Sequence, residues 1–385
     1  MKIHLCVIMG GKSVEHEISI ITAVQAIQAL NREKYEIIPL YITKSGEFYT
    51  SPAMCEIDSF KDIPALLQRS ERVAFVRKGG TVYLEGEKKG LKRPYCVNID
   101  VAFPIVHGTN AEDGTLAGFL NLLDLPYCGC DVLSAANSMD KLTTKDILRA
   151  KGIPVLAATD FYAGRWVSER AAVLDLIEKN HRFPIIVKPV NLGSSVGVYK
   201  VKTREDLAAA IDDCFLLCSR VMIENAVENL REINCSVLGD VYEAVASPCE
   251  EPVGADAILS YGDKYMSGQK GMSGQTRKLP ADIGEEQTGL IQKYAVEAFQ
   301  ALGCAGVARI DFLTDAKTGE IYVNELNTIP GSLSFYLWEA AGLHYCDLLD
   351  RIIMLAFKRD RERKNLNFSF DTDILSGFSF GGLKK

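Results

Sequence analysis

The sequence predicts an α/β domain followed by α+β segments, and the first observation behind this is a strand–helix–strand opening. Residues 2–9 form an apolar strand that ends in Gly10-Gly11. Ser13 is expected to cap a helix running to about residue 30, with apolar residues at helical spacing, and residues 35–42 return as a strand. An opening of this kind is typical of a parallel sheet.

The second observation is a series of short strands and helices in which neighbouring strands are joined by turns. Strands are expected at 99–105, 183–188, 197–200, 221–224, 232–238, 241–246, 307–314 and 320–325. Helices are expected from 138 to about 150 and at 204–213, 283–302 and 346–363. Consecutive strands with short connections predict antiparallel hairpins. Residues 248–282 lack periodicity, which is typical of a functional lid or of disorder.

These elements predict four parts of the chain. Residues 1–130 form the N-terminal domain, 131–226 a central subdomain with a glycine-serine loop, 227–363 a C-terminal subdomain, and 364–385 an irregular tail. A length of 385 residues suits two or three domains with sizeable cores.

Composition excludes several classes of function. The net charge of −7 argues against a nucleic-acid surface. No apolar run approaches the roughly 18 residues of a membrane span. The eleven cysteines are scattered, and Cys128 and Cys130 are spaced too closely for a usual zinc clip. We therefore expect a cytoplasmic protein with reduced thiols.

The pair of strands at 307–314 and 320–325 carries a candidate metal site. Residues two apart on a strand share a face, so Arg309 lies beside Asp311 and Glu325 beside Asn327. Two close carboxylates repel unless a cation lies between them. A solvated hairpin face would give the same pattern, but the carboxylate and amide oxygens favour Mg²⁺, with Arg309 facing a transferring phosphoryl group.

A glycine-serine loop at 189–197 contains Ser194 and Ser195 and follows Lys188. Small residues let backbone N–H groups approach an anion, so the loop is a candidate phosphate site. A plain hairpin loop is the common alternative for such a motif. Lys141 is a second candidate cation, although it also fits a solvated helix position.

Three glutamates and a histidine are further candidates. Glu224 and Glu232 lie where a carboxylate could accept from ribose or adenine, or could simply face solvent. Glu15 falls in the first turn of a helix, where the dipole alone would favour it. His107 ends a strand at the ligand-binding edge of the predicted sheet, so it is either structural or functional.

Together these segments resemble the D-alanine–D-alanine ligases of the ATP-grasp superfamily. The resemblance runs from residue 3 to about 356. The matching stretches, in family order, are 10–15, 107–115, 126–129, 139–141, 187–189 with 193–197, 263–265, 309–311, 324–328 and 330–331. The resemblance implies an ATP-grasp fold behind a parallel-sheet domain that binds the first substrate. It also implies amino-acid substrates, peptidoglycan synthesis and a homodimer.

The resemblance also implies a role for each matching residue. ATP would be bound by Lys141, Lys188, Ser194, Ser195, Glu224, Glu232 and Lys264, and two Mg²⁺ ions (Mn²⁺ is possible) by Asp311, Glu325 and Asn327. Glu15, His107 and Arg309 would contact the amino acids. Ser194 and Tyr265 would link with Glu15 to close the lid. Arg309 and the N–H of Gly331 would stabilise an oxyanion formed after the first carboxylate is phosphorylated.

The chain departs from the family pattern next to Gly331. The family has a serine five residues past this glycine that grips the second substrate's carboxylate, and this chain has Tyr336. Ser332 and Tyr336 are therefore candidate contacts to the second substrate. D-alanine is the expected acceptor, with D-serine, a hydroxy acid or another amine as alternatives. A nucleotide-binding regulatory protein without turnover is an alternative of another class.

Overall fold

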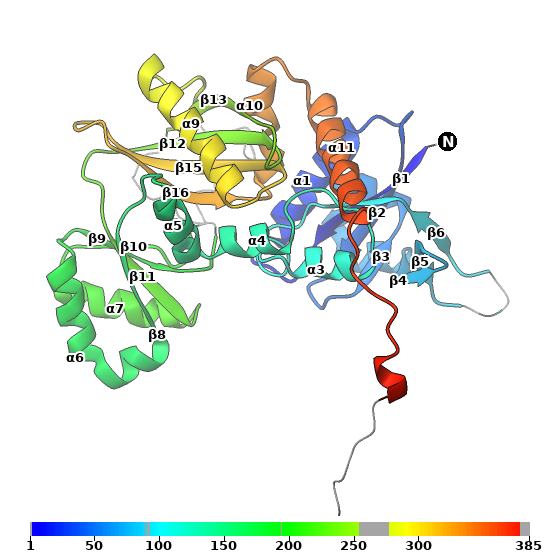
Figure 1. The fold of residues 1–385 in the computed structure, drawn as a ribbon, viewed down its shortest axis with the longest axis horizontal. Helices are drawn as coiled ribbons and strands as arrows, with labels where there is room; N and C mark the ends of the chain where they lie inside the picture. Colours follow the sequence, from blue (N-terminus) through cyan, green and yellow to red (C-terminus); the bar gives the residue numbers. More distant parts are fainter. Residues whose placement is uncertain (1, 89, 91–92, 194, 254–276, 378–385) are drawn as a thin grey trace, which may run out of the picture.

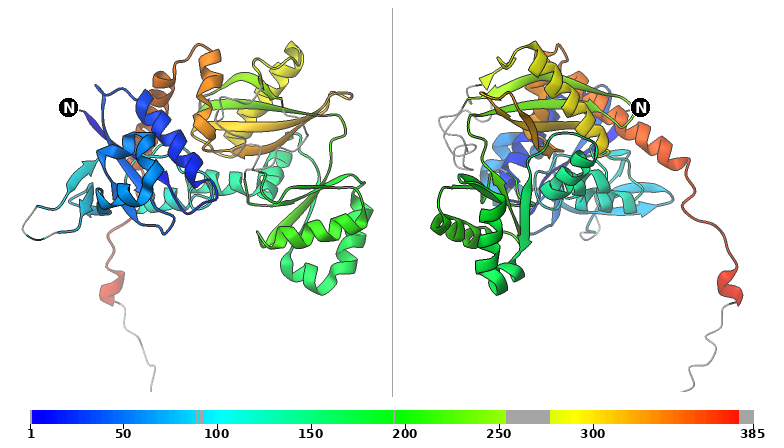
Figure 2. Two further views of the ribbon diagram at one scale, coloured as in Figure 1. Left: turned by 180° about the vertical axis from the view of Figure 1, so that it is seen from behind. Right: turned by 60° about the vertical axis from the view of Figure 1, so that its left-hand side comes forward.

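The computed structural model describes residues 2–88, 90, 93–193, 195–253 and 277–377. Three β-sheets follow one another along the chain, each covered by helices (Figures 1 and 2). The order of elements confirms the mixed α/β and α+β class that the sequence predicts.

The first sheet combines parallel and antiparallel strands. Its order is β6-β5-β4-β3-β2-β1-β7. The strands are β1 (Ile3–Gly10), β2 (Tyr35–Ile42), β3 (Phe48–Thr50), β4 (Glu71–Lys78), β5 (Thr81–Gly86), β6 (Cys96–Ile99) and β7 (Val101–Pro104). Only β1 is parallel to its neighbours β2 and β7. The expectation of a parallel sheet is thus right for the end of the sheet formed by β2, β1 and β7 and wrong for the antiparallel strands from β3 to β6.

The second and third sheets are antiparallel throughout. The second has the order β10-β9-β11-β8, from β8 (Ala158–Tyr162), β9 (Ile185–Pro189), β10 (Tyr199–Val201) and β11 (Arg220–Asn225). The third has the order β14-β13-β12-β15-β16, from β12 (Leu230–Gly239), β13 (Ala244–Pro252), β14 (Arg277–Lys278), β15 (Gly306–Asp315) and β16 (Ile321–Asn327). All three predicted hairpins are present.

The helices cover the sheets. They are α1 (His16–Ala29), α2 (Ile63–Gln68), α3 (Thr115–Leu122), α4 (Val132–Met139), α5 (Lys141–Ala150), α6 (Ala163–Asn180), α7 (Arg204–Phe215), α9 (Glu285–Ala301), α10 (Phe335–Ala340) and α11 (Tyr345–Lys364). Short 3₁₀ turns lie at Pro52–Cys55, Ile57–Asp62, Gly331–Ser334 and Ile374–Gly377. Among the helices of the described residues, none combines the length and apolar character that crossing a bilayer requires.

Two predicted helix starts are wrong. The helix expected from residue 138 is divided at Asp140, whose carboxylate accepts hydrogen bonds from the N–H groups of Leu142 (3.1 Å) and Thr143 (2.8 Å) and so begins α5. Ser13 does not cap α1. Its hydroxyl instead accepts from the N–H of Glu15 at 3.1 Å, and the helix begins only at His16.

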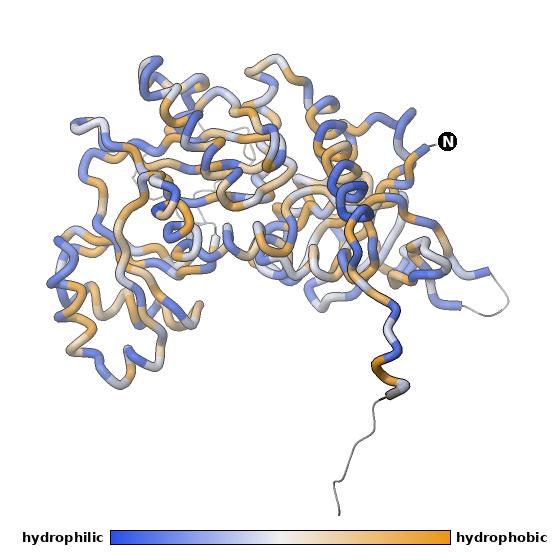
Figure 3. The backbone as a smooth tube through the Cα atoms, viewed as in Figure 1, coloured by the Kyte–Doolittle hydropathy of each residue, from blue (hydrophilic) through white to orange (hydrophobic). Residues whose placement is uncertain are grey.

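The last long helix joins two parts of the molecule. Although α11 follows the third sheet in sequence, its residues Leu348, Ile352 and Ile353 share a buried core with β1 and α1 (Figure 1). Figure 3 shows apolar residues alternating with polar ones along this helix, as one buried face requires. The third sheet has a separate core with α9. Leu238 and Val307 of the third sheet also belong to the core of α11, so burial against both sheets holds this helix in place.

We expect Ile353→Ala to lower the free energy of unfolding by about 2–5 kcal/mol, because it opens a cavity in a fully buried site. The measurement is denaturant-induced unfolding followed by circular dichroism. Met354→Ala is the matched control, since that neighbouring side chain is 56% exposed. Equal effects of the two substitutions would contradict the packing assigned to α11.

Candidate functional site

A cleft lies where the loops after β1 and β7 meet the third sheet. Its walls include Glu15 and His107 from the first domain. Arg309, Asp311, Glu325, Asn327 and Gly331 contribute from the hairpin of β15 and β16 and the loop that follows it. Residues that are more than 200 positions apart in the sequence thus line one cavity.

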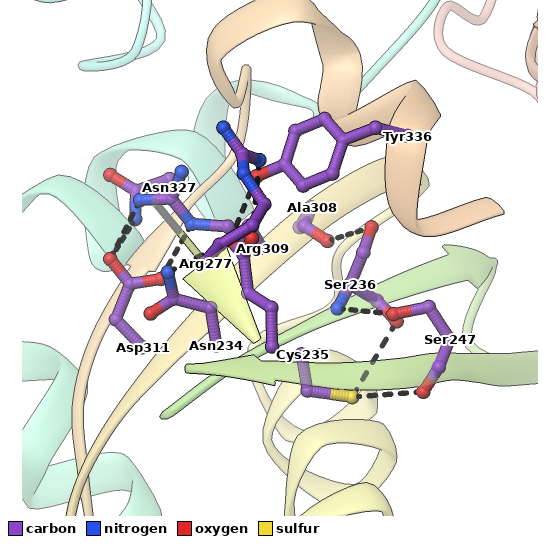
Figure 4. A network of polar contacts seen from close by, with 11 residues as sticks. Asn234, Cys235, Ser236, Ser247, Arg277, Ala308, Arg309, Asp311, Asn327 and Tyr336 are labelled. Atoms are coloured by element: carbon purple, nitrogen blue, oxygen red, sulfur yellow. Dashed lines mark hydrogen bonds and ion pairs between the residues drawn. The ribbon is translucent and has the colours of Figure 1, made fainter. Parts of the chain in front are cut away.

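The β15–β16 hairpin assembles the predicted metal cluster. Asp311 is the direct cross-strand partner of Glu325, and Arg309 is the partner of Asn327. The guanidinium of Arg309 binds both oxygens of Asp311 at 2.7 and 2.8 Å. The amide of Asn327 donates to the same carboxylate at 3.0 Å (Figure 4). Two carboxylates and one side-chain amide therefore gather on one face of the sheet.

A second cavity adjoins this cleft between the second and third sheets. Both cavities are lined by Ser195, Glu232, Asn324 and Glu325. The wall of this cavity combines charged and apolar side chains. The charged ones include Lys141, Lys188 and Glu224, and the apolar ones include Ile186, Val227, Leu230 and Leu313. A pocket with an apolar part and a cationic end suits a ligand with a flat ring and a polyanionic tail.

The two predicted phosphate lysines lie in this second cavity. Lys141 is at the start of α5, where its ammonium lies 3.3 Å from Glu325 and donates to the carbonyl of Leu192 at 2.7 Å. Lys188 on β9 donates to the side-chain oxygen of Asn324 at 3.1 Å. Both lysines thus connect the region of the second sheet to the β15–β16 hairpin.

Glu224 occupies a more buried position than the sequence suggested. Its carboxylate is 1% exposed and forms ion pairs with Lys188 at 2.7 Å and Lys145 at 2.6 Å. Burial would raise the pKa of this carboxyl, but the two lysines lower it to about 2. Its contact with adenosine stays a prediction. Its contacts in this structure fix the position of Lys188.

Lys145 is a residue that the sequence argument missed. It lies four residues after Lys141 on α5, and its side chain is 1% exposed. Spacing of four places two lysines on one helix face, and this was the available signal. A buried ammonium is stable only when paired, so Lys145 and Glu224 depend on each other.

The N-terminal residues form the opposite side of the cleft. Glu15 is 9% exposed just before α1. The Nε2 of His107 lies 3.0 Å from the hydroxyl of Thr22. Burial lowers the pKa of His107, although Glu15 acts in the opposite direction. The structure therefore brings both predicted first-substrate residues to the cleft, and their roles stay predictions.

Glu112 is a further cleft residue whose importance was not predicted. One carboxyl oxygen accepts from the N–H of Gly108 at 2.8 Å, and the other accepts from the N–H of Ile329 at 3.2 Å. The first domain is thereby tied to the loop before Gly331. Burial, and next the nearby Glu15, raise the pKa of Glu112 to about 8.

The loop after β16 has an unusual backbone. Ser332, Leu333 and Ser334 all have left-handed conformations, with φ of 50°, 50° and 52°. The Ser332 hydroxyl donates to Gln25 of α1 at 2.8 Å, and its N–H donates to Thr22 at 3.2 Å. The Ser332 side chain is thus directed at α1, and its contact with substrate stays a prediction.

Tyr336, at the start of α10, does line the cleft. Of the other predicted residues, Ser195 lines both cavities and Gly331 lines the first. Ser194, Lys264 and Tyr265 lie outside the described residues. The predicted lid contact among Glu15, Ser194 and Tyr265 therefore stays a prediction.

The two adjoining cavities, one lined by lysines and apolar side chains and one by the carboxylates of the hairpin, lie in a fold that comparison with known proteins assigns to a family of ligases. Family models described as "D-ala D-ala ligase N-terminus" and "D-ala D-ala ligase C-terminus" match residues 4–130 and 147–354. The D-alanine–D-alanine ligase of Thermosipho melanesiensis is 39% identical over 97% of this chain and 98% of its own length. That of Caldicellulosiruptor bescii is 37% identical, with coverage of 96% and 99%.

Solved structures extend this result. The D-alanine–D-alanine ligase from Coxiella burnetii superimposes with a TM-score of 0.79 at 32% identity, covering 94% of this chain and 96% of that one. The VanG D-Ala:D-Ser ligase from Enterococcus faecalis has a TM-score of 0.77 at 31% identity, with coverage of 92% and 100%. The Bacillus anthracis ligase complexed with ATP has a TM-score of 0.65 at 28% identity, with coverage of 94% and 99%. The chain belongs to the D-alanine–D-alanine ligase family.

The raised pKa of Glu112 predicts a pH-dependent stability. The folded protein keeps this carboxyl protonated up to about pH 8, whereas the unfolded chain releases the proton near 4.5. The folded state therefore binds more protons in this window, and the stability of the wild type should fall as the pH rises through it. Denaturant unfolding of the wild type and Glu112→Gln across this window measures the difference. We expect a smaller slope in the variant, and identical slopes would refute the assignment.

Proposed function

We propose that this protein is an ATP-dependent D-alanine–D-alanine ligase that produces D-alanyl-D-alanine, ADP and phosphate for peptidoglycan precursors. The observation that carries the proposal is the Asp311–Glu325 pair, which lies between the lysine-lined cavity and the cleft with Glu15 and His107. Because the proposed enzyme uses ATP and free amino acids to make a peptidoglycan precursor, we expect it to act in the cytoplasm. The family resemblance supports a homodimer.

The first half-reaction needs charge neutralisation. A carboxylate oxygen of the first D-alanine attacks the γ-phosphorus of ATP, the bond to ADP breaks, and an acyl phosphate forms. Positioning and electrostatic stabilisation account for most of the catalysis of such transfers. Lys141 and Lys188 supply positive charge at the cationic end of the second cavity. The Lys145–Glu224 ion pair keeps the Lys188 side chain in one orientation.

The oxygen donors of the hairpin fit a hard divalent cation. Asp311, Glu325 and Asn327 would hold Mg²⁺, as two ions in the family pattern, with Mn²⁺ as a substitute. The described residues contain no metal-binding cluster of three or more His, Cys, Asp or Glu side chains, so the proposed site depends on two carboxylates and one amide. Two carboxylates and an amide would supply part of the coordination shell of Mg²⁺, and phosphate oxygens of ATP would complete it. Bound Mg²⁺ would neutralise the charge that develops on those oxygens.

The second half-reaction joins the two amino acids. The amine of the second D-alanine attacks the acyl carbon, and phosphate leaves as the amide forms with loss of a proton. Arg309, held by Asp311, lies where it could stabilise an oxyanion, together with the N–H of Gly331. Glu15 could accept a hydrogen bond from the ammonium of the first substrate.

The proposal is tested by phosphate release with ATP, Mg²⁺ and single or paired amino acids. We expect turnover with D-alanine alone and a dipeptide product. If turnover occurs only when D-alanine is paired with D-serine, a hydroxy acid or another amine, the acceptor is that compound and not D-alanine. ATP binding without turnover for every pair would favour the regulatory alternative.

We expect Glu325→Gln to abolish most phosphate release. A fall in kcat of about 100- to 1,000-fold is typical for removing one preorganised stabiliser of transition-state charge. Glu320→Gln is the matched control, because this glutamate is exposed beside the turn of the same hairpin. Near-normal activity of Glu325→Gln would remove the metal assignment.

A further inference from the structure

One wall of the cleft is a compact polar cluster that the chemistry above does not use. Glu250 on β13 is 3% exposed and accepts three hydrogen bonds. They come from the hydroxyl of Tyr336 at 2.8 Å, the amide of Asn234 at 3.1 Å and the guanidinium of Arg277 at 3.2 Å. Tyr336, Asn234, Glu250 and Arg277 all line the same cleft as Arg309.

Tyr336 does not replace the serine that the family has at its position. A phenol has one proton, and Tyr336 donates it to Glu250. Burial, and next the charge of Glu250, raise the pKa of this phenol, so the proton stays in place. The hydroxyl therefore does not supply the O–H donor that a substrate carboxylate would need, and another side chain must do so.

Arg277 is the side chain placed to take over this task. Its guanidinium stacks against the Tyr336 ring, 4.1 Å from the ring centroid, and Figure 4 shows Arg277 beside Tyr336. One guanidinium nitrogen also donates to Glu250 at 3.2 Å. Stacking and the ion pair together fix the plane of the guanidinium. A planar group with five N–H donors can bridge two carboxylates, one from the protein and one from a ligand.

The charges around Arg277 separate its role from that of Glu250. Glu250 is nearly inaccessible and is surrounded by three donors, so it positions Arg277 rather than binding substrate. Arg309, the neighbouring cation in the cleft, is bound to Asp311 through two nitrogens. Arg277 thus adds a second cation to the cleft wall, beside Tyr336 and on the same side as the departure from the family pattern.

We propose that Arg277, held by Tyr336 and Glu250, binds the carboxylate of the second amino acid and makes the enzyme select acceptors that carry one. This inference rests on the proposed ligase function. Tyr336 and Glu250 are positioning residues, and Arg277 contacts the substrate. The acceptor's amine would then be directed from Arg277 toward the reacting carbonyl near Arg309 and Gly331.

The test is a competition between two acceptors in one reaction. D-alaninamide has the amine of D-alanine but no carboxylate, so it can act as acceptor and never as donor. Both products, D-alanyl-D-alanine and D-alanyl-D-alaninamide, share the ATP and donor steps. Their ratio therefore reports acceptor selection alone, and a general loss of activity leaves it unchanged.

For Arg277→Gln we expect the product ratio to shift toward the amide by about 10- to 100-fold, the effect of losing one charge-assisted partner. Lys278→Gln is the matched control, because this neighbour on β14 is exposed and pairs with Glu251 instead. A ratio that Arg277→Gln leaves unchanged would overturn the proposal, whether or not total activity falls.

Tyr336→Phe distinguishes direct from indirect action of the tyrosine. It removes the hydrogen bond to Glu250 and keeps the ring under which Arg277 lies. We expect a shift in the product ratio at least several-fold smaller than that of Arg277→Gln. An equal or larger shift would show that the hydroxyl itself binds the acceptor and would overturn the assignment to Arg277. Wild-type enzyme that forms neither product would refute the ligase function and not this assignment.

Discussion

The register of β15 between its two neighbours is the constraint on which the site depends. Asp311 is the cross-strand partner of Asn234 on β12 and of Glu325 on β16. Because side chains alternate along a strand, the same register directs Ile310 and Phe312 into the core with α9. A slip of one residue would exchange the core face for the site face. Hydrophobic burial on one side of the sheet therefore enforces the polar geometry on the other.

Buried charge connects this hairpin to the second sheet. Glu224 holds Lys145 and Lys188 in an interior where each charge alone would be costly. Lys188 in turn reaches Asn324, and Lys141 reaches Glu325, both on β16. Removing one member of such a network would be destabilising, because its partner would stay buried without a counter-charge. The complete network adds little net stability, so its main effect is to fix the orientation of the lysines. The two walls of the second cavity are thereby held in a fixed relative position.

The identity of the acceptor is the feature that fold and family leave open. A D-alanine–D-alanine ligase and a D-Ala:D-Ser ligase superimpose on this chain almost equally well, with TM-scores of 0.79 and 0.77. The difference must therefore come from a few side chains of the cleft. Tyr336, Glu250 and Arg277 are the side chains that we propose for this selection, and they come from α10 and from two strands of the third sheet.

The sequence by itself determined the fold class, the hairpin with Asp311 and Glu325, and the candidate lysines, because these depend on local periodicity and on residues close together in the chain. It also located the departure at Tyr336. Only the tertiary structure decided how Glu112 reaches Ile329, how Lys145 meets Glu224, and how Tyr336 shares Glu250 with Arg277. Each of these contacts joins residues that are at least 27 positions apart in the sequence. Burial and long-range pairing create them, and no pattern in the sequence records which distant partner a charged side chain will find.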